Sequence, residues 1–209
     1  MNTQQGYLLV VEDIPDILSL LDTTLKFGGY RVVTARNGLE ALEAIARELP
    51  VLVITDVLMP RLDGFGLVHR LRINSGTREI PVIVITATYV APEDREFALS
   101  IGVTRFIEKP VDLEQFLSIV AELLVKGTPA KLESLDEIKF YNGYRKRLEV
   151  KLAQKIAQIA RTEQMLETPS EEDELSLRAS LRLAIGEREE ILLLLAQVRE
   201  HIEKNIKPE

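Results

Sequence analysis

The sequence contains no cysteine among its 209 residues. A disulfide framework, a thiolate metal site and a cysteine nucleophile are therefore excluded. No apolar run approaches the ~18–20 residues that a membrane-spanning helix needs, so we expect no membrane segment. The first residues, MNTQQGYLLVVED, lack the basic start and the cleavage site of a secretory signal peptide. These absences together predict a cytoplasmic protein.

The sequence also has fewer positively charged residues than negatively charged ones. The 26 lysines and arginines are outnumbered by 33 aspartates and glutamates, which gives a net charge of −7. A net negative charge disfavours non-specific binding to nucleic acid. Hydrophobic residues make up 46% of the sequence, which is enough for a substantial core. We therefore expect a folded protein that does not bind nucleic acid.

The composition changes near residue 126. The part before it holds most of the phenylalanines, and the part after it is rich in Leu, Ile, Ala, Glu, Lys and Arg, a helix-forming mixture. Gly127 and Pro129 end a helix between the two parts. We therefore predict a first domain over residues 1–125, a linker over 126–133 and a helical region over 134–209.

Short apolar segments alternate with amphipathic stretches in the first domain. Five segments have the character of buried strands: Tyr7–Val11, Arg31–Ala35, Val51–Asp56, Pro81–Thr86 and Thr104–Glu108. Apolar residues at helical spacing predict one helix after each strand, five in all: Pro15–Phe27, 37–48, Gly64–Ile73, Pro92–Ile101 and 112–125. Apolar strands that alternate with helices indicate an α/β fold with a parallel sheet covered on both faces.

Polar side chains stand at the ends of four of these strands. Glu12 and Asp13 follow the first strand, Asp56 ends the third, Thr86 ends the fourth and Lys109 follows the fifth. In an open parallel sheet, ligands bind outside the carboxyl ends of the strands. Clustered carboxylates repel one another unless a cation neutralises them, and Mg²⁺ favours such oxygen ligands. The sequence therefore predicts a magnesium site, with the lysine amine balancing further charge.

This succession of motifs resembles the receiver domain of two-component response regulators. The resemblance covers residues 7–125 and is carried by Glu12-Asp13, Asp56, Met59-Pro60, Asp63-Gly64, Thr86, Phe106 and Lys109-Pro110. It implies a five-stranded, doubly wound parallel sheet with the flavodoxin-like order 2-1-3-4-5. It also implies a signalling protein rather than an enzyme, one that assists its own phosphorylation and dephosphorylation.

The resemblance assigns roles to individual residues. Asp56 would accept a phosphoryl group from a histidine kinase or a phosphotransfer protein. Such a transfer needs mainly positioning of the reacting groups and stabilisation of their charge. Glu12, Asp13, Asp56 and the backbone carbonyl of Leu58 would bind Mg²⁺. Lys109 would pair with Asp56 or with the phosphoryl oxygen, and its peptide bond to the following proline would be cis.

Two further residues would transmit the phosphorylated state. The hydroxyl of Thr86 would donate a hydrogen bond to the phosphoryl group and move inward, and Phe106 would rotate into the vacated space. Leu58 and Thr88, each two positions beyond a motif residue, would tune dephosphorylation. His69 is interpreted as a surface residue with no ligand role.

Two long amphipathic helices are predicted after the linker. The first, of about 33 residues, carries apolar residues at Leu135, Ile138, Tyr141, Tyr144, Leu148, Leu152, Ile156, Ile159 and Leu166. The second has a heptad pattern with a charged break at Arg188: Leu177, Leu181, Ala184, Ile191, Leu195, Val198 and Ile202. Between them, Thr168, Pro169 and Glu171 predict a helix start.

This pattern predicts an antiparallel helical hairpin or coiled coil. Two helices bury only one stripe each, so we expect a homodimer with four helices, or a complex with a partner protein. The basic cluster Arg145-Lys146-Arg147, with Lys151 and Lys155, is interpreted as a solvated helix face. His201 lacks the sequence context of a phosphotransfer histidine.

Three functions remain open at this stage. The first is a response regulator that signals through protein contacts of the helical region. The second is a phosphorylation-independent scaffold or adaptor, and the third is a DNA-binding transcriptional regulator. The intact acidic site favours the first, because a scaffold has no need for three carboxylates and a lysine on one edge.

Overall fold

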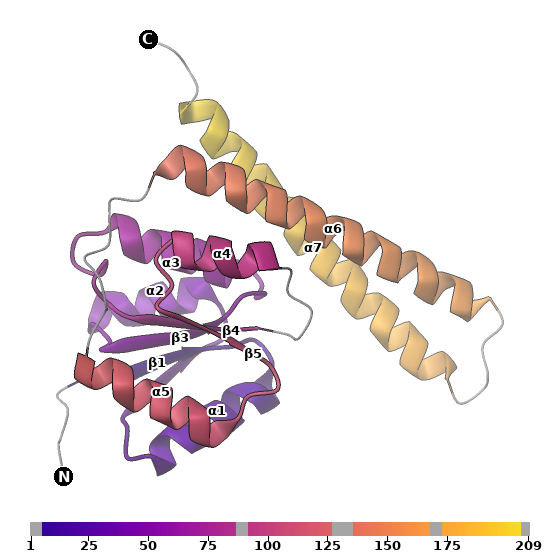
Figure 1. Cartoon of the computed structure of the whole chain (residues 1–209). Helices are drawn as coiled ribbons and strands as arrows, with labels where there is room; N and C mark the ends of the chain where they lie inside the picture. Colours follow the sequence, from indigo (N-terminus) through magenta and orange to yellow (C-terminus); the bar gives the residue numbers. More distant parts are fainter. Residues whose placement is uncertain (1–5, 87–91, 127–135, 168–172, 206–209) are drawn as a thin grey trace. The chain divides into compact units, whose positions relative to one another are not determined.

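The computed structural model describes residues 6–86, 92–126, 136–167 and 173–205 (Figure 1). The chain divides into two compact units, residues 1–135 and 136–209, and each is described by itself. Apart from Lys126, the predicted linker 126–133 lies outside the described residues. Among the helices that are described, none has the length and apolar character needed to cross a bilayer.

The first unit contains a sheet of five parallel strands. The strands are β1 (Leu8–Val11), β2 (Val32–Ala35), β3 (Leu52–Asp56), β4 (Val82–Thr86) and β5 (Arg105–Glu108). They lie in the order β2-β1-β3-β4-β5, with every neighbouring pair parallel. This confirms the predicted fold class and strand order.

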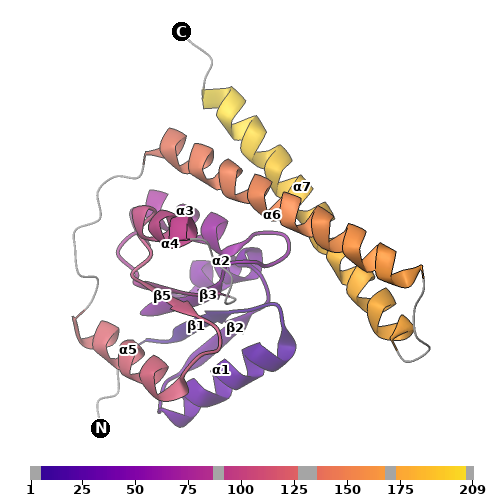
Figure 2. The ribbon, with the colours of Figure 1, turned by 45° about the vertical axis from the view of Figure 1, so that its right-hand side comes forward.

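Helices cover both faces of this sheet. They are α1 (Pro15–Phe27), α2 (Gly38–Arg47), α3 (Gly64–Ile73), α4 (Pro92–Ser100) and α5 (Leu113–Lys126). Helices α1 and α5 lie on one face, and α2, α3 and α4 lie on the other (Figure 2). Asn37 caps α2 by accepting hydrogen bonds from the amides of Leu39 and Glu40. Gly102, with φ +90°, ends α4 in the left-handed region that glycine adopts without strain.

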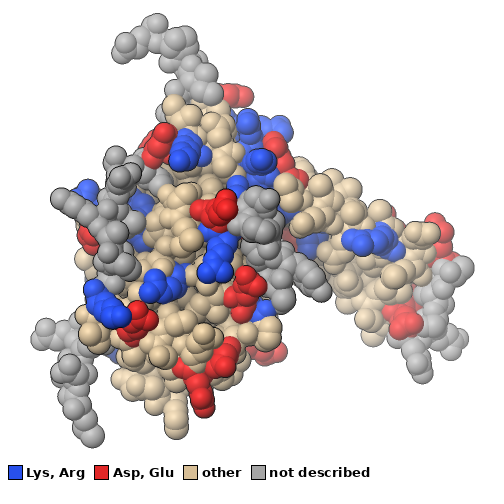
Figure 3. All heavy atoms as spheres, viewed as in Figure 1, with Lys and Arg blue, Asp and Glu red and all other residues tan. Residues whose placement is uncertain are grey.

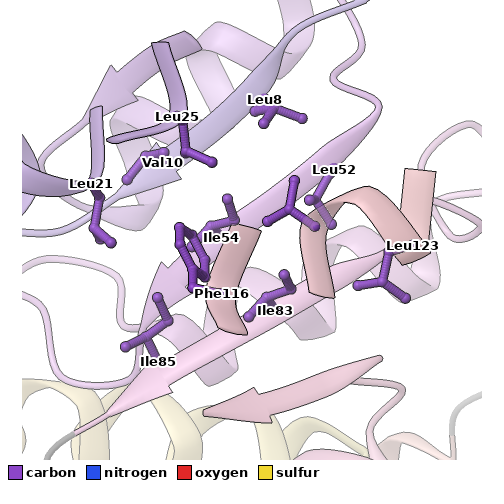
Figure 4. Close-up of a cluster of buried hydrophobic side chains, with 11 residues drawn as sticks. Leu8, Val10, Leu21, Leu25, Leu52, Ile54, Ile83, Ile85, Phe116 and Leu123 are labelled. Atoms are coloured by element: carbon purple, nitrogen blue, oxygen red, sulfur yellow. The ribbon is translucent and has the colours of Figure 1, made fainter. Parts of the chain in front are cut away.

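A continuous core lies between the sheet and helices α1 and α5 (Figure 4). Alternate strand residues point to this face, because successive side chains of a strand point to opposite sides. The cluster consists of Leu8, Val10, Leu21, Leu25, Leu52, Ile54, Ile83, Ile85, Phe116, Val120 and Leu123. The core holds the carboxyl ends of β1, β3 and β4 at one edge of the sheet.

His69 was predicted to lie at the surface, and this prediction is wrong. Its side chain is 4% exposed. Helix α3 follows the central strand β3 and is covered on most sides, so that its residues other than Arg70 and Ile73 are buried. Arg72 is buried as well, and it donates hydrogen bonds to the carbonyls of Gly102 and Arg78. Burial lowers the pKa of this guanidinium to about 10.

The second unit consists of α6 (Glu137–Leu166) and α7 (Glu174–Asn205), which lie side by side as an antiparallel pair (Figure 1). Asp136 caps α6 by accepting a hydrogen bond from the amide of Lys139. The contacts between the helices include an ion pair and a stacked pair of rings. Lys155 forms an ion pair with Glu187 at 2.6 Å, and the ring of Tyr141 stacks on His201. The start predicted at residues 168–171 lies outside the described residues.

The buried stripe of α7 agrees with the prediction, since Ala184, Ile191, Leu195 and Val198 are buried. The stripe of α6 agrees with the prediction only in part: Tyr144, Leu148 and Ile159 are buried as predicted, but the stripe as a whole is rotated. Ile138 and Ile156 are 53% and 51% exposed, whereas Phe140 and Thr162 are buried.

Lys155 explains part of this rotation, because its side chain is only 19% exposed at the contact with α7. A lysine can bury its aliphatic stem while its ammonium reaches an acid. The interpretation of the whole basic cluster as a solvated face is therefore wrong for this residue.

Candidate functional site

The predicted polar residues meet at the carboxyl edge of the sheet. Glu12 and Asp13 follow β1, Asp56 is the last residue of β3, and Thr86 is the last residue of β4. Lys109 follows β5 directly. The parallel register brings these strand ends to one edge, as the prediction required.

Asp56 is held in a fixed orientation. It is 8% exposed. Its Oδ2 accepts a hydrogen bond of 2.8 Å from the amide of Leu58, and its Oδ1 lies 3.1 Å from the Nζ of Lys109. Both carboxylate oxygens therefore have positively polarised partners, which orients the carboxylate toward the edge of the sheet.

Lys109 joins two strands of the sheet. Besides Asp56, its Nζ donates a hydrogen bond of 2.8 Å to Oε2 of Glu12, whose side chain is 1% exposed. Its backbone amide donates a hydrogen bond of 2.7 Å to the carbonyl of Thr86. The peptide bond between Lys109 and Pro110 is cis, as predicted. The contact with Glu12 was not foreseen, because strand positions alone do not tell which carboxylate an ammonium reaches.

Three carboxylates form a candidate metal site. Ligand oxygens of Glu12, Asp13 and Asp56 all lie within 4.8 Å of one another. Clustered carboxylate oxygens on a rigid edge suit a hard divalent cation such as Mg²⁺, which uses one or two carboxylates and keeps several waters. Asp13 is half-buried, which leaves room for water. The donor set of the described residues therefore fits the predicted ion.

The electrostatics of the cluster follow from burial and charge. Burial raises the pKa of Asp56, the ammonium of Lys109 opposes this, and Glu12 adds to it. Burial also raises the pKa of Asp13. Burial alone would lower the pKa of Lys109, but the carboxylates of Asp56 and Glu12 together raise it above its ordinary value. One ammonium therefore faces more negative charge than it can neutralise.

The loop between β3 and α3 is shaped by a close backbone approach. A Cβ on Gly64 would overlap the carbonyl oxygen of Asp56, so that only glycine fits. The amide of Gly64 donates a hydrogen bond of 2.9 Å to the carbonyl of Val57. Asp63 caps α3 by accepting a hydrogen bond from the amide of Gly66. The motif Asp63-Gly64 therefore turns the chain tightly beneath Asp56.

The two predicted switch residues lie outside the acidic cluster. Thr86 is buried and is linked to the site through its carbonyl. Phe106 is half-buried in β5, opposite Val84 of β4. Thr88 lies outside the described residues. The structure therefore brings together Glu12, Asp13, Asp56 and Lys109, with Leu58 joined to them through its amide.

A doubly wound sheet of order 2-1-3-4-5 with this acidic edge is the architecture of receiver domains in two-component signalling. The family model for the response regulator receiver domain matches residues 8–121, which is more than half of the chain. The chain therefore belongs to the receiver domain family of response regulators.

Relatives share this domain in different settings. The chain is 39% identical over 122 residues to an uncharacterized 14.6 kDa protein from the sodA1 3' region of Leptolyngbya boryana, which covers 58% of this chain and 92% of that protein. It is 32% identical over 191 residues to the uncharacterized transcriptional regulatory protein YkoG of Bacillus subtilis, which covers 90% of this chain and 79% of YkoG. The chain spans about half the length of several other curated relatives.

A solved structure has the same fold. It is the signal receiver domain of a signal transduction histidine kinase from Syntrophus aciditrophicus, with 35% identity and a TM-score of 0.55. The match covers 62% of this chain and 98% of that one.

Proposed function

We propose that the protein is a phosphorylation-dependent response regulator in which Asp56 accepts a phosphoryl group from a histidine kinase or a phosphotransfer protein. The observation that carries this proposal is the contact of the Asp56 carboxylate with Lys109 beside Glu12 and Asp13. In the transfer, an oxygen of Asp56 forms a bond to phosphorus while the nitrogen–phosphorus bond of the donor histidine breaks. The leaving imidazole takes up a proton.

The residues of the site divide this work. Asp56 is the nucleophile and is held at the end of a rigid strand, which favours in-line attack. Lys109 supplies positive charge next to the phosphoryl oxygens that gain negative charge. Glu12, Asp13, Asp56 and the carbonyl of Leu58 would hold Mg²⁺. When bound, the ion would neutralise charge on the carboxylates and on the incoming phosphoryl group.

The phosphorylated state would be transmitted by Thr86 and Phe106. The hydroxyl of Thr86 would donate to a phosphoryl oxygen, and Phe106 would turn inward beside it. The half-buried setting of Phe106 on β5 supports this role. The hairpin of residues 134–209, joined by the linker 126–133, would carry the state to a partner protein, and we propose that it pairs with a second copy.

Incubation of the full chain with a radiolabelled phosphoryl donor and Mg²⁺ tests the proposal. Label should enter the wild type and not Asp56→Asn, whose amide oxygen can still accept the hydrogen bond from Leu58. Asp16→Asn, at an exposed position of α1, is the matched control and should take up label as the wild type does. Label on an aspartate of Asp56→Asn would place the acceptor elsewhere.

Beryllofluoride with Mg²⁺, which mimics an acyl phosphate, tests whether the state is transmitted. A change in hydrogen exchange at β4 and β5 supports transmission, and no change favours the scaffold. On the face drawn in Figure 3, basic and acidic side chains are interspersed, which does not suggest a DNA-binding surface. Because YkoG is named a transcriptional regulatory protein, retardation of duplex DNA is the appropriate check.

A further inference from the structure

The hairpin carries apolar side chains outside the contact between its two helices. On α6, Ile156 is 51% exposed and Leu152 is half-buried. On α7, Leu192 is 46% exposed and Ile185 is half-buried. These four residues are here called the lateral face. They are additional to the buried stripe, so the face is available to a partner.

The part of the lateral face on α6 belongs to a regular stripe. Arg145, Glu149, Leu152, Ile156 and Glu163 follow one another at intervals of four, three, four and seven residues. Within a single helix over Glu137–Leu166, this spacing places them on one side. At 3.6 residues per turn, the stripe lies about a quarter of a turn from the residues buried against α7.

Four of the five residues of the stripe match one another when its direction is reversed, and the fifth, Glu149, forms an ion pair with Arg145 of its own helix. Leu152 and Ile156 are each two residues from position 154, and Arg145 and Glu163 are each nine residues from it. Two antiparallel copies of α6 that cross at this position bring Leu152 to Ile156 and Arg145 to Glu163 of the second copy. A parallel crossing would instead place like charges opposite one another, which is unfavourable.

Helix α7 is centred at the same level. The ion pair of Lys155 with Glu187 and the stacking of Tyr141 on His201 both place position 154 of α6 level with position 188 of α7. Ile185 lies three residues before position 188, and Leu192 lies four residues after it. The same two-fold axis therefore brings these two residues together across the copies.

Both parts of the lateral face lie on one side of the hairpin. When each helix is viewed from its N-terminus, its lateral-face residues are rotated away from its buried stripe, and the direction of this rotation is the same in both helices. Two antiparallel helices with this relation present those residues on the same side. Copies stacked through this side form a four-helix arrangement in which all neighbouring helices run antiparallel.

We propose that the lateral face binds a second copy of the hairpin, antiparallel and centred on residue 154 of α6 and residue 188 of α7. A second copy fits better than an unrelated partner because Arg145 and Glu163 of the stripe each meet the opposite charge in the reversed stripe. This inference deepens the proposed pairing of the hairpin. It does not depend on phosphorylation of Asp56.

Charge reversal in the full chain tests the proposal. Arg145→Glu and Glu163→Arg should each raise the dissociation constant of the dimer by about tenfold, because attraction becomes repulsion at two symmetry-related places. Sedimentation equilibrium measures this constant. The two changes combined should restore the wild-type affinity. Lys146→Glu, an exposed neighbour outside the stripe, makes the same charge change and should leave the affinity unaltered.

Cross-linking tests the direction, since the chain contains no cysteine. In the proposed pairing, residue 149 of one copy lies within one residue of residue 160 of the other. Two copies of residue 149 would be about 15 Å apart at 1.5 Å per residue, beyond the reach of a disulfide. A mixture of Glu149→Cys and Ala160→Cys should therefore form the mixed disulfide in preference to either homodimer.

Three results would overturn the proposal: a monomer at every concentration, preferential homodimer disulfides, or a failure of the double charge reversal to restore binding. Circular dichroism of each variant shows that the helices are retained. Label uptake at Asp56 is measured on the same variants. Normal uptake by a chain that does not pair as proposed would overturn this inference and leave the proposed function intact.

Discussion

At the scale of single residues, Lys109 has the most exacting position in the site. Its ammonium contacts Glu12, which follows β1, and Asp56, which ends β3. These contacts neutralise carboxylates that burial makes costly to ionise. The same ammonium that we propose to contact the phosphoryl group therefore also stabilises the fold when no phosphoryl group is present.

Replacing Lys109 by alanine should lower the free energy of unfolding by about 1–3 kcal/mol in the absence of Mg²⁺, because two buried carboxylates lose their cation. Mg²⁺ should recover much of this loss by neutralising the same carboxylates. Urea unfolding with and without the ion measures both effects. Lys126→Ala removes an exposed ion pair with Glu122 and should change stability by less than about 0.5 kcal/mol. Equal stability of Lys109→Ala and the wild type without Mg²⁺ would contradict the assigned role.

Which residues face which was only partly predictable. The sequence placed Glu12, Asp13, Asp56 and Lys109 at strand ends because apolar runs stop there. It did not indicate the burial of His69, because a histidine among arginines and leucines resembles an exposed residue until the neighbouring helices are placed.

At the scale of elements, two glycines show how backbone position decides what a residue does. Gly64 begins α3 directly beneath the carbonyl of Asp56, whereas a Cβ on Gly186 of α7 would meet no heavy atom within 4 Å beyond the neighbouring backbone of its own helix. The first glycine is needed for a close approach of two backbones. The second only adds conformational freedom to the unfolded chain.

Alanine at these two positions should therefore have opposite effects. Gly64→Ala should destabilise the first unit by about 1–3 kcal/mol and lower label uptake, because the loop must move away from Asp56. Gly186→Ala should stabilise the hairpin by about 0.5–1 kcal/mol. Calorimetric unfolding measures both. A neutral Gly64→Ala would show that the loop relaxes without strain.

Both helices of the hairpin were predictable, but the rotation of α6 was not. The heptad pattern of α7 predicted its buried stripe. On α6 the apolar residues form a wider band than one partner helix can cover. The pairing of Lys155 with Glu187 selects part of that band and leaves Ile156 outside.

At the scale of the whole molecule, the chain consists of two compact units. Every residue of the candidate site and the described core cluster belongs to the first unit. The relative from Leptolyngbya boryana consists of little more than this unit, because the match covers 92% of that protein. The chemistry of the site and the contacts of the hairpin should therefore be separable.

A fragment of residues 1–135 should fold alone and take up label at Asp56 at a rate similar to that of the full chain. Uptake, circular dichroism and sedimentation of the fragment are the measurements. The fragment should be monomeric at concentrations where the full chain dimerises. Loss of uptake in a folded fragment would show that the hairpin contributes to the site.

The sequence by itself determined the sheet, its order of strands through the family resemblance, and the edge at which the polar residues gather. Strand and helix periodicity are local properties, and a parallel sheet brings its carboxyl ends to one edge. Only the tertiary structure decided that Lys109 bridges Glu12 and Asp56, that His69 is buried, and that part of the apolar band of α6 stays exposed. Each of these depends on how neighbouring elements are rotated against one another, and side-chain spacing along one element does not specify that rotation.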